Sequence, residues 1–255
     1  MRVLVTGASG RLGSVLVDRL TGEGHIVRAM SRRTRPVRDG VEWVVADLAE
    51  GVGVERAVHG MDVVVHLASA PYRGRYTERV ESGGTRLLAS AARDAGVAHL
   101  VYTSIVGVHR IPWGYFASKY RAEKIVESSG VPFTILRATQ FHELVNLAMR
   151  GMSRLGVLAV DRAISAQPVD VRDVADRLLP IVAGRPTGGT EDFGGPEILG
   201  SGELARQWSD VTGRRRPVLP IKVPGGLGRA FRAGHLTTST TPTGTRTWAQ
   251  YLESL

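Results

Sequence analysis

The chain of 255 residues contains no cysteine. Without thiols, a disulfide framework and a thiolate metal site are both excluded, and the composition is compatible with a reducing compartment. No apolar run approaches the length that spans a bilayer. We expect the first strand to begin at Arg2, which leaves no room for the charged and apolar regions of an export signal. These absences predict a cytoplasmic protein that does not enter a membrane.

Lysine is also scarce, because Lys119, Lys124 and Lys222 are the only lysines among 33 basic residues and the others are arginines. A net charge of +9 would favour a nucleic-acid partner if the basic residues were clustered. They are scattered, and no helix-turn-helix, zinc or RNA-binding motif accompanies them. No His, Asp or Glu cluster has metal-ligand spacing. We therefore expect a small-molecule substrate, no nucleic acid, no metal, and a monomer or homodimer.

A glycine-rich turn near the start is the most informative feature that is present. Residues 3–13 read Val-Leu-Val-Thr-Gly-Ala-Ser-Gly-Arg-Leu-Gly, so that an apolar run leads into Gly7, Gly10 and Gly13 at a spacing of three. Glycine allows the sharp turn and the close approach of a pyrophosphate, and the N-terminus of the following helix attracts the anion. Another apolar run, His25–Met30, follows this helix. The pattern predicts a βαβ unit that binds a dinucleotide.

Apolar runs alternate with helical patterns through the first half of the chain, which predicts a Rossmann-type α/β fold with a parallel, doubly wound sheet. The expected strands are Val3–Thr6, His25–Met30, Glu42–Ala46, Asp62–Leu67, Leu100–Thr103 and Phe133–Arg137. The expected helices of this half are Leu12–Leu20, Val54–Val58, Thr85–Ala95 and Ser118–Ser128.

The rhythm changes after Arg137. We expect residues 1–139 to form the dinucleotide-binding core, and residues 140–255 to form a mixed C-terminal part with a small substrate lobe and elements that complete the sheet. Helices are expected at Val171–Val182, Ser201–Val211 and Thr245–Leu252. Residues 185–200 and 233–245 are rich in Gly, Pro and Thr, which is typical of loops.

The residues that follow the second expected strand indicate which cofactor binds. An Asp or Glu at this place accepts hydrogen bonds from the ribose hydroxyls of NAD. Here Ser31, Arg32 and Arg33 occupy the place, and the next acidic residue is Asp39. Arginine binds phosphate groups in a bidentate manner, so NADP(H) is predicted to be preferred over NAD(H).

A second group of residues predicts acid–base chemistry. Tyr115 and Lys119 are four residues apart, which places both side chains on one face of a helix, and Ser104 follows the fifth expected strand. A nearby ammonium favours the phenolate form of a tyrosine. A tyrosine tuned in this way can exchange a proton with a carbonyl or alcohol oxygen, as hydride transfer requires.

The chain resembles the short-chain dehydrogenase/reductase superfamily, in its atypical or extended form, and the NAD(P)H-binding group that includes the NmrA-like proteins. The resemblance covers nearly the whole chain. The matching segments are residues 6–13, 46–48, 64–69, 101–108, 115–119, 136–141 and 168–175.

The resemblance implies that Asp47 and Leu48 hold the adenine, that Ala68 and Ser69 line the ribose and phosphates, and that Ala138 and Thr139 approach the nicotinamide. The full set of expected cofactor contacts is Gly7, Ser9, Gly10, Arg11, Leu12, Gly13, Ser31, Arg32, Arg33, Asp47, Leu48, Ala68, Ser69, Thr103, Lys119, Ala138 and Thr139. Trp113, Phe141 and His142 are the expected substrate contacts, although a structural role for His142 is the stronger reading.

Three functions are consistent with these residues, and the third, which these residues favour least, is an epimerase or dehydratase that uses a bound cofactor. The first is an NADPH-dependent oxidoreductase that reduces a small carbonyl or quinone, or oxidises the alcohol, with Tyr115, Lys119 and Ser104 as catalytic residues. The second is a regulator of the NmrA-like kind that binds NADP(H) without turning it over. Many NmrA-like proteins lack the tyrosine, so the Tyr115–Lys119 pair favours the enzyme.

Overall fold

The computed structural model describes residues 1–71 and 73–255 and divides them into two compact units. The first unit comprises residues 1–104, 114–136 and 175–191, and the second comprises residues 105–113, 137–174 and 192–255. Each unit is therefore assembled from segments that are far apart in the sequence. The expected division of the chain at residues 139 and 140 stays a prediction.

The first unit is built on a seven-stranded sheet with the strand order β3-β2-β1-β4-β5-β6-β9. The pairs β3·β2, β2·β1, β1·β4 and β4·β5 are parallel. The strand order reverses between β1 and β4, and ligands of doubly wound sheets bind at such a point. The strands are β1 (Arg2–Thr6), β2 (Ile26–Ser31), β3 (Val41–Val45), β4 (Val63–His66), β5 (His99–Ile105), β6 (Phe133–Ala138) and β9 (Thr190–Phe193).

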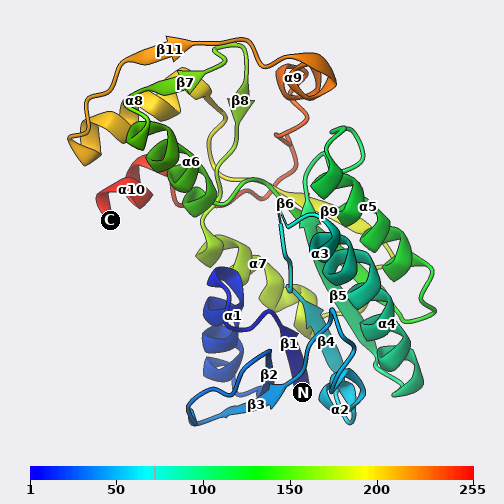
Figure 1. Ribbon diagram of the computed structural model, residues 1–255. Helices are drawn as coiled ribbons and strands as arrows, with labels where there is room; N and C mark the ends of the chain where they lie inside the picture. The colour runs from blue at the N-terminus through cyan, green and yellow to red at the C-terminus, as the bar shows by residue number, and fades with distance from the viewer. Residues whose placement is uncertain (72) are drawn as a thin grey trace. The chain divides into compact units, whose positions relative to one another are not determined.

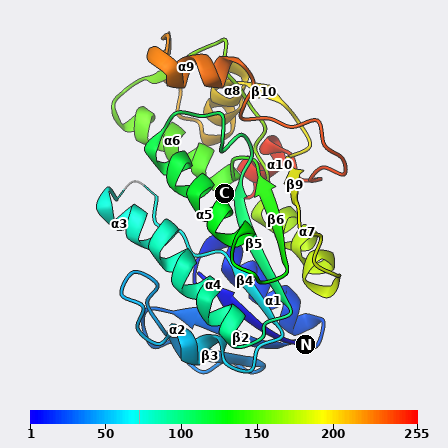
Figure 2. The same ribbon diagram turned by 90° about the vertical axis from the view of Figure 1, so that its right-hand side faces the viewer.

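Helices cover both faces of this sheet (Figures 1 and 2). Helices α1 (Arg11–Gly22) and α7 (Val171–Ala183) lie on one face, and an ion pair joins Arg19 to Asp176. The other face carries α2 (Val54–Val58), α4 (Thr85–Asp94) and α5 (Gly114–Glu127). A short helix α3 (Arg75–Glu78) and a π-helical segment η1 (Arg79–Gly84) run directly into α4.

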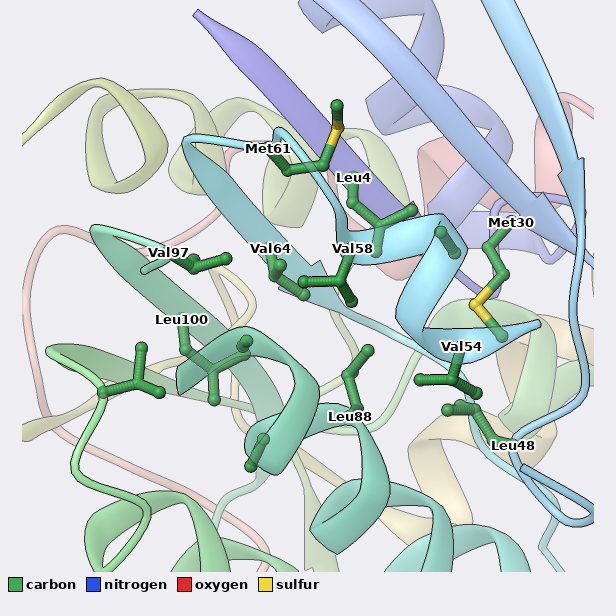
Figure 3. Close-up of a cluster of buried hydrophobic side chains, with 14 of the residues drawn as sticks. Leu4, Met30, Leu48, Val54, Val58, Met61, Val64, Leu88, Val97 and Leu100 are labelled. Carbon is green, nitrogen blue, oxygen red and sulfur yellow. The ribbon is translucent and has the colours of Figure 1, made fainter. Parts of the chain in front are cut away.

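One hydrophobic cluster of the first unit lies between the sheet and the helices α2, α4 and α5. Leu4, Val64 and Leu100 come from three adjacent strands and point toward Val58 and Leu88 of the helices (Figure 3). All five side chains are essentially inaccessible to solvent. Successive strand residues face opposite sides of a sheet, so the continuous apolar runs of β1 and β4 show that both faces are buried.

The second unit has a smaller core of its own. Trp208 and Trp248 are its largest buried side chains, and they pack with Met149, Leu158 and Tyr251. The elements that supply these and neighbouring residues are α6 (His142–Arg154), β7 (Leu158–Val160), β8 (Ser165–Ala166), β10 (Leu199–Gly200), α8 (Ser201–Thr212), β11 (Val218–Pro220), α9 (Gly225–Arg232) and α10 (Trp248–Glu253). Strands β7 and β11 pair in parallel, and β8 and β10 pair antiparallel.

The predicted parallel sheet and all six predicted strands are confirmed within two residues at each end. One expectation is wrong: residues 185–200 are not all loop, because β9 and β10 lie there. Composition could not reveal β9, since its Thr-Glu-Asp-Phe sequence has three polar residues and only Phe193 is buried. Helices α3, α6 and α9 and segment η1 were not anticipated either.

A glycine in α1 offers a test of the packing. A Cβ atom on Gly13 would lie 2.2 Å from the carbonyl oxygen of Gly7, whereas one on Gly22, in the same helix, would meet no described atom within 4 Å. We expect Gly13→Ala to lower the free energy of unfolding by about 1–3 kcal/mol, the usual effect of overpacking. Gly22→Ala should be neutral or slightly stabilising, since alanine favours helix. Urea unfolding of the two variants checks this, and equal stabilities would contradict the close packing.

Candidate active site

The turn after β1 brings two backbone segments unusually close together. Gly7 has a φ of +64°, and a Cβ atom there would lie 2.8 Å from the amide nitrogen of Ala68, which follows β4. The amide of Gly10 donates a hydrogen bond to the carbonyl of Gly7 at 2.8 Å. Helix α1 begins at Arg11 without a side-chain cap, so its first amides are available to an anion.

A cavity of about 450 Å³ opens beside this turn, within the size range of ligand sites. It contains nine of the predicted cofactor contacts: Gly7, Ser9, Gly10, Ser31, Arg32, Asp47, Leu48, Ala68 and Ser69. Its other lining residues are Met30, Ala46, Leu67, Ala70, Pro71, Arg73, Tyr76 and Val80. Sequence reasoning missed Arg73, Tyr76 and Val80 because α3 and η1 themselves were not anticipated.

One edge of the cavity is basic. The Arg32 guanidinium donates a hydrogen bond to the Tyr76 hydroxyl at 2.7 Å, and Arg73 lines the same cavity. Asp47 is the acidic residue among the lining residues, and its Oδ1 accepts a hydrogen bond from the amide of Ala49. Arg33, in contrast, is exposed and is not among the lining residues.

These features fit a dinucleotide. The missing Cβ atom of Gly7 lets the backbone of Ala68 approach closely. The uncapped first amides of α1 are available to a pyrophosphate. Ser31, Arg32, Asp47 and Leu48 all line the cavity, and their expected contacts with a ribose phosphate and with the adenine stay predictions.

Tyr115 lies at the start of α5, which begins at Gly114, four residues earlier than expected. Its side chain is half-buried, and its hydroxyl is 2.9 Å from the Oγ of Ser69. Ser69 is one of the residues that line the cavity. The predicted acid–base tyrosine therefore reaches the wall of the dinucleotide cavity within the first unit.

Lys119 lies one turn further along α5 and is only 4% exposed. Its Nζ donates a hydrogen bond to the carbonyl of Thr103 at 2.8 Å and lies 4.3 Å from the centre of the Tyr102 ring. The Oε2 of Glu81 is 3.6 Å away. Burial lowers the pKa of Lys119, and the charges of Glu81 and Glu123 oppose this effect.

Glu81 is a site residue that sequence reasoning missed. It is 1% exposed, and its Oε1 accepts hydrogen bonds from the Ser69 hydroxyl at 2.6 Å and from the amide of Ala70 at 2.9 Å. Glutamate is rarely buried unless it is paired. The π-helical turn of η1 places this side chain inward, and no local pattern in the sequence reveals such a turn.

Ser104 and Thr103 lie near the end of β5 and are not among the residues that line the cavity. The Ser104 side chain is 3% exposed, and its hydroxyl makes no hydrogen bond with any described residue. Thr103 is 9% exposed and contributes its carbonyl to Lys119 rather than a surface to the cavity. The hydroxyl that contacts Tyr115 in this structure is that of Ser69, and the expected substrate contact of Ser104 stays a prediction.

His66 connects the ends of β1 and β4. The Thr6 hydroxyl accepts hydrogen bonds from the amides of Leu67 and Ala68, so it donates its own hydrogen to His66 Nδ1 at 2.8 Å. We therefore assign the proton to Nε2, which faces the hydroxyl of Thr85 at 3.0 Å. Burial, together with the charge of Lys119, lowers the pKa of His66 to about 3.

Arg11, Leu12 and Gly13 form the first turn of α1 in the first unit and are not among the residues that line the cavity. The other predicted contacts lie in the second unit. His142 is wholly buried, and its ring lies 5.7 Å from Trp248 and 5.0 Å from Tyr251, centre to centre. This packing supports the structural role of His142. Trp113 is 37% exposed. Three more predicted contacts lie at or just after the end of β6: Ala138, Thr139 and Phe141.

Comparison with known proteins identifies the family. Residues 7–183 match the model of the NAD(P)H-binding family, and the chain belongs to it. The predicted resemblance to the short-chain dehydrogenase/reductase superfamily is thereby confirmed for cofactor class and fold, and a solved member of that superfamily shares the fold. The NmrA-like grouping stays a prediction.

Three similar proteins illustrate the relationship. A nucleoside-diphosphate-sugar epimerase from Staphylococcus aureus has a TM-score of 0.82 at 19% identity, over 99% of this chain and 100% of that one. An NADPH-dependent quinone oxidoreductase from Escherichia coli has a TM-score of 0.78 at 18% identity, over 99% and 98%. An uncharacterised protein of Mycobacterium tuberculosis is 31% identical over 227 residues, which is 88% of this chain and 24% of that protein.

The chain spans only part of curated relatives that it matches, from 24% to 54% of their length. Within residues 1–71 and 73–255, no helix combines the length and apolar character that crossing a membrane requires. The same residues contain no group of three or more His, Cys, Asp or Glu side chains that could hold a metal ion.

The depressed pKa of His66 predicts an acid-sensitive fold. The unfolded chain takes up a proton near pH 6.5 and the folded chain only near pH 3, so the stabilising effect is complete above pH 6.5 and is lost as the pH falls toward 3. Between pH 7.5 and 5.5, this one group should reduce the free energy of unfolding by about 1.4 kcal/mol.

Urea unfolding of the parent and of His66→Gln at both pH values measures the effect. Glutamine can accept from Thr6 and donate to Thr85 but does not titrate. We expect the pH dependence of the variant to be smaller by that amount, with a residual slope from His99, whose pKa burial also lowers. An unchanged slope would show that His66 does not stay neutral in the folded protein.

Proposed function

We propose that the protein is an NADPH-dependent oxidoreductase that reduces a small carbonyl or quinone, or oxidises the corresponding alcohol, with Tyr115 as general acid and base. The observation that carries the proposal is the contact of Tyr115 with Ser69 at 2.9 Å, because Ser69 lines the cavity beside the glycine turn. The proposed acid–base group thus contacts a residue that lines the cavity. The likeness to an NADPH-dependent quinone oxidoreductase supports the same reaction class.

The nicotinamide of the bound cofactor supplies or accepts the hydride. Tyr115 gives its proton to the substrate oxygen during reduction and removes it during oxidation. Lys119, one helical turn away, favours the phenolate by its positive charge. We assign the hydroxyl of Ser104, which has no partner among the described residues, to position the substrate oxygen.

A regulator that binds NADP(H) without turnover is the alternative. The observation that favours it is the burial of Lys119, whose ammonium contacts the Thr103 carbonyl and Glu81 and does not line the cavity. Steady oxidation of NADPH with any member of a carbonyl and quinone panel supports the enzyme. Cofactor binding without turnover across the panel supports the regulator.

The basic edge of the cavity predicts cofactor preference. If Arg32 forms a charge-assisted hydrogen bond with a ribose phosphate, the bond contributes about 1.5–3 kcal/mol, or a roughly tenfold to hundredfold preference for NADPH over NADH. Arg32→Ala should remove most of this preference and leave NADH binding nearly unchanged. Arg33→Ala is the matched control, since Arg33 is exposed outside the cavity, and its effect should be smaller.

Fluorescence titration of the parent and the two variants with each nucleotide measures the six affinities. Equal affinity of the parent for NADPH and NADH would contradict the assignment of Ser31 and Arg32 to the phosphate. So would an Arg32→Ala variant that binds NADPH as tightly as the parent does.

The acid–base role of Tyr115 has a direct test. Tyr115→Phe keeps the ring and removes the proton, so turnover should fall by about 10²–10⁴ while NADPH binding is retained. Tyr120→Phe is the matched control, because Tyr120 lies on the same helix and its ring contacts Lys124. The control should keep the parent rate. A Tyr115→Phe variant that turns over substrate at the parent rate would rule out the role.

A further inference from the structure

The buried Glu81 carboxylate has no role in the chemistry proposed so far, yet it lies between the two proposed acid–base residues. One oxygen, Oε1, accepts a hydrogen bond from the Ser69 hydroxyl at 2.6 Å, and Ser69 in turn contacts the Tyr115 hydroxyl. The other oxygen, Oε2, faces the ammonium of Lys119 at 3.6 Å. A single side chain therefore connects with the tyrosine on one side and with the lysine on the other.

The direction of the hydrogen bonds follows from the donors that are available. Ser69 donates its one hydroxyl hydrogen to the Oε1 of Glu81. Ser69 then has no hydrogen left for Tyr115, and the phenol must donate to the Ser69 oxygen. Hydrogen bonding of this kind stabilises the protonated phenol, which is the form that can give a proton to a substrate.

The charges around Lys119 also favour the protonated form of Tyr115. The titratable groups that face it are Glu81 from η1, Glu123 from α5, Tyr102 from β5 and His66 from β4. The pKa of Tyr102 lies well above its usual value because of burial, and the low pKa of His66 keeps that ring neutral. Lys119 therefore faces two carboxylates, so its charge is largely balanced before it acts on Tyr115.

We propose that Glu81 is a positioning residue of the proposed catalytic site, which keeps Tyr115 protonated by orienting Ser69 and by offsetting the charge of Lys119. The effect of Glu81 on catalysis rests on the proposed function. The hydrogen bonds from Glu81 through Ser69 to Tyr115 are present whether or not the protein turns over a substrate. The proposed role explains why a carboxylate is buried at this place. It also means that the lysine alone does not set the acidity of the tyrosine.

The test follows the titration of Tyr115 itself. Tyrosinate absorbs at longer ultraviolet wavelengths than tyrosine, so the difference between each protein and its own Tyr115→Phe derivative reports this one residue. We expect Glu81→Gln to shift the titration midpoint to lower pH by about one unit, because glutamine still accepts from Ser69 and Ala70 but carries no charge. Ser69→Ala, a change on the cavity wall, should shift the midpoint in the same direction by removing the acceptor of the phenol.

Glu78→Gln is the matched control, since Glu78 precedes Glu81 by one helical turn and pairs with Arg121. Its midpoint should equal that of the parent. Circular dichroism at each pH restricts the comparison to folded protein, and Ser69→Ala tests the chain if Glu81→Gln does not fold. If the midpoint of Glu81→Gln stays in place or rises, the inference is overturned. If only Ser69→Ala folds, an unchanged midpoint in that variant overturns it.

Kinetics separate this outcome from failure of the proposed function. If the enzyme is active, the rising limb of the alcohol-oxidation rate should shift to lower pH in Glu81→Gln by the same amount as the titration. If Tyr115→Phe loses turnover but the midpoints do not differ, the function stands and the role of Glu81 is wrong. If no substrate turns over but the midpoints differ, the role of Glu81 in setting the acidity of Tyr115 stands and the catalytic proposal fails.

Discussion

The contact between the chain after β1 and the chain after β4 is the constraint on which the rest of the site depends. Gly7 approaches the Ala68 amide so closely that no side chain fits between them. This approach brings the ends of two parallel strands together at the point where the strand order reverses. The cavity lies there because both connecting segments leave the sheet at the same edge. The glycine turn that lines it presents backbone amides, which can approach phosphate groups directly.

Much of this could be predicted from the sequence because the signals are local. Runs such as Val63–His66 are apolar throughout, as strands buried on both faces must be, and the spacing of Gly7, Gly10 and Gly13 indicates the turn. Tyr115 and Lys119 share a helix by spacing alone. The π-helical segment η1 and the burial of Glu81 could not be predicted, since they depend on packing between helices that are distant in sequence. The polar strand β9 has no distinctive pattern either.

Arginine has two different roles in the first unit: Arg28 is part of the fold, whereas Arg32 lines the cavity. The guanidinium of Arg28, in the middle of β2, donates to the carbonyls of Ala57 and His59 and pairs with Glu42. It completes the carbonyl end of α2 and is part of the fold. Arg32 comes four residues later, beyond the end of the strand, where its guanidinium borders the cavity. Position relative to the strand end, and not the overall charge of +9, decides which arginine is available to a ligand.

The network that holds the fold also positions the chemistry. His66 joins the Thr6 hydroxyl to the Thr85 hydroxyl, and Thr85 donates to the backbone carbonyl of Glu81. The same glutamate then orients Ser69 through its side chain. Hydrogen bonds thus run from the end of β1 and the end of β4 to the backbone of Glu81, and the side chain of the same residue holds the serine that faces Tyr115. If Glu81 has the proposed role, a change at the strand ends that displaces its backbone would also displace Ser69, so the turn and the proposed acid–base group would share one set of contacts.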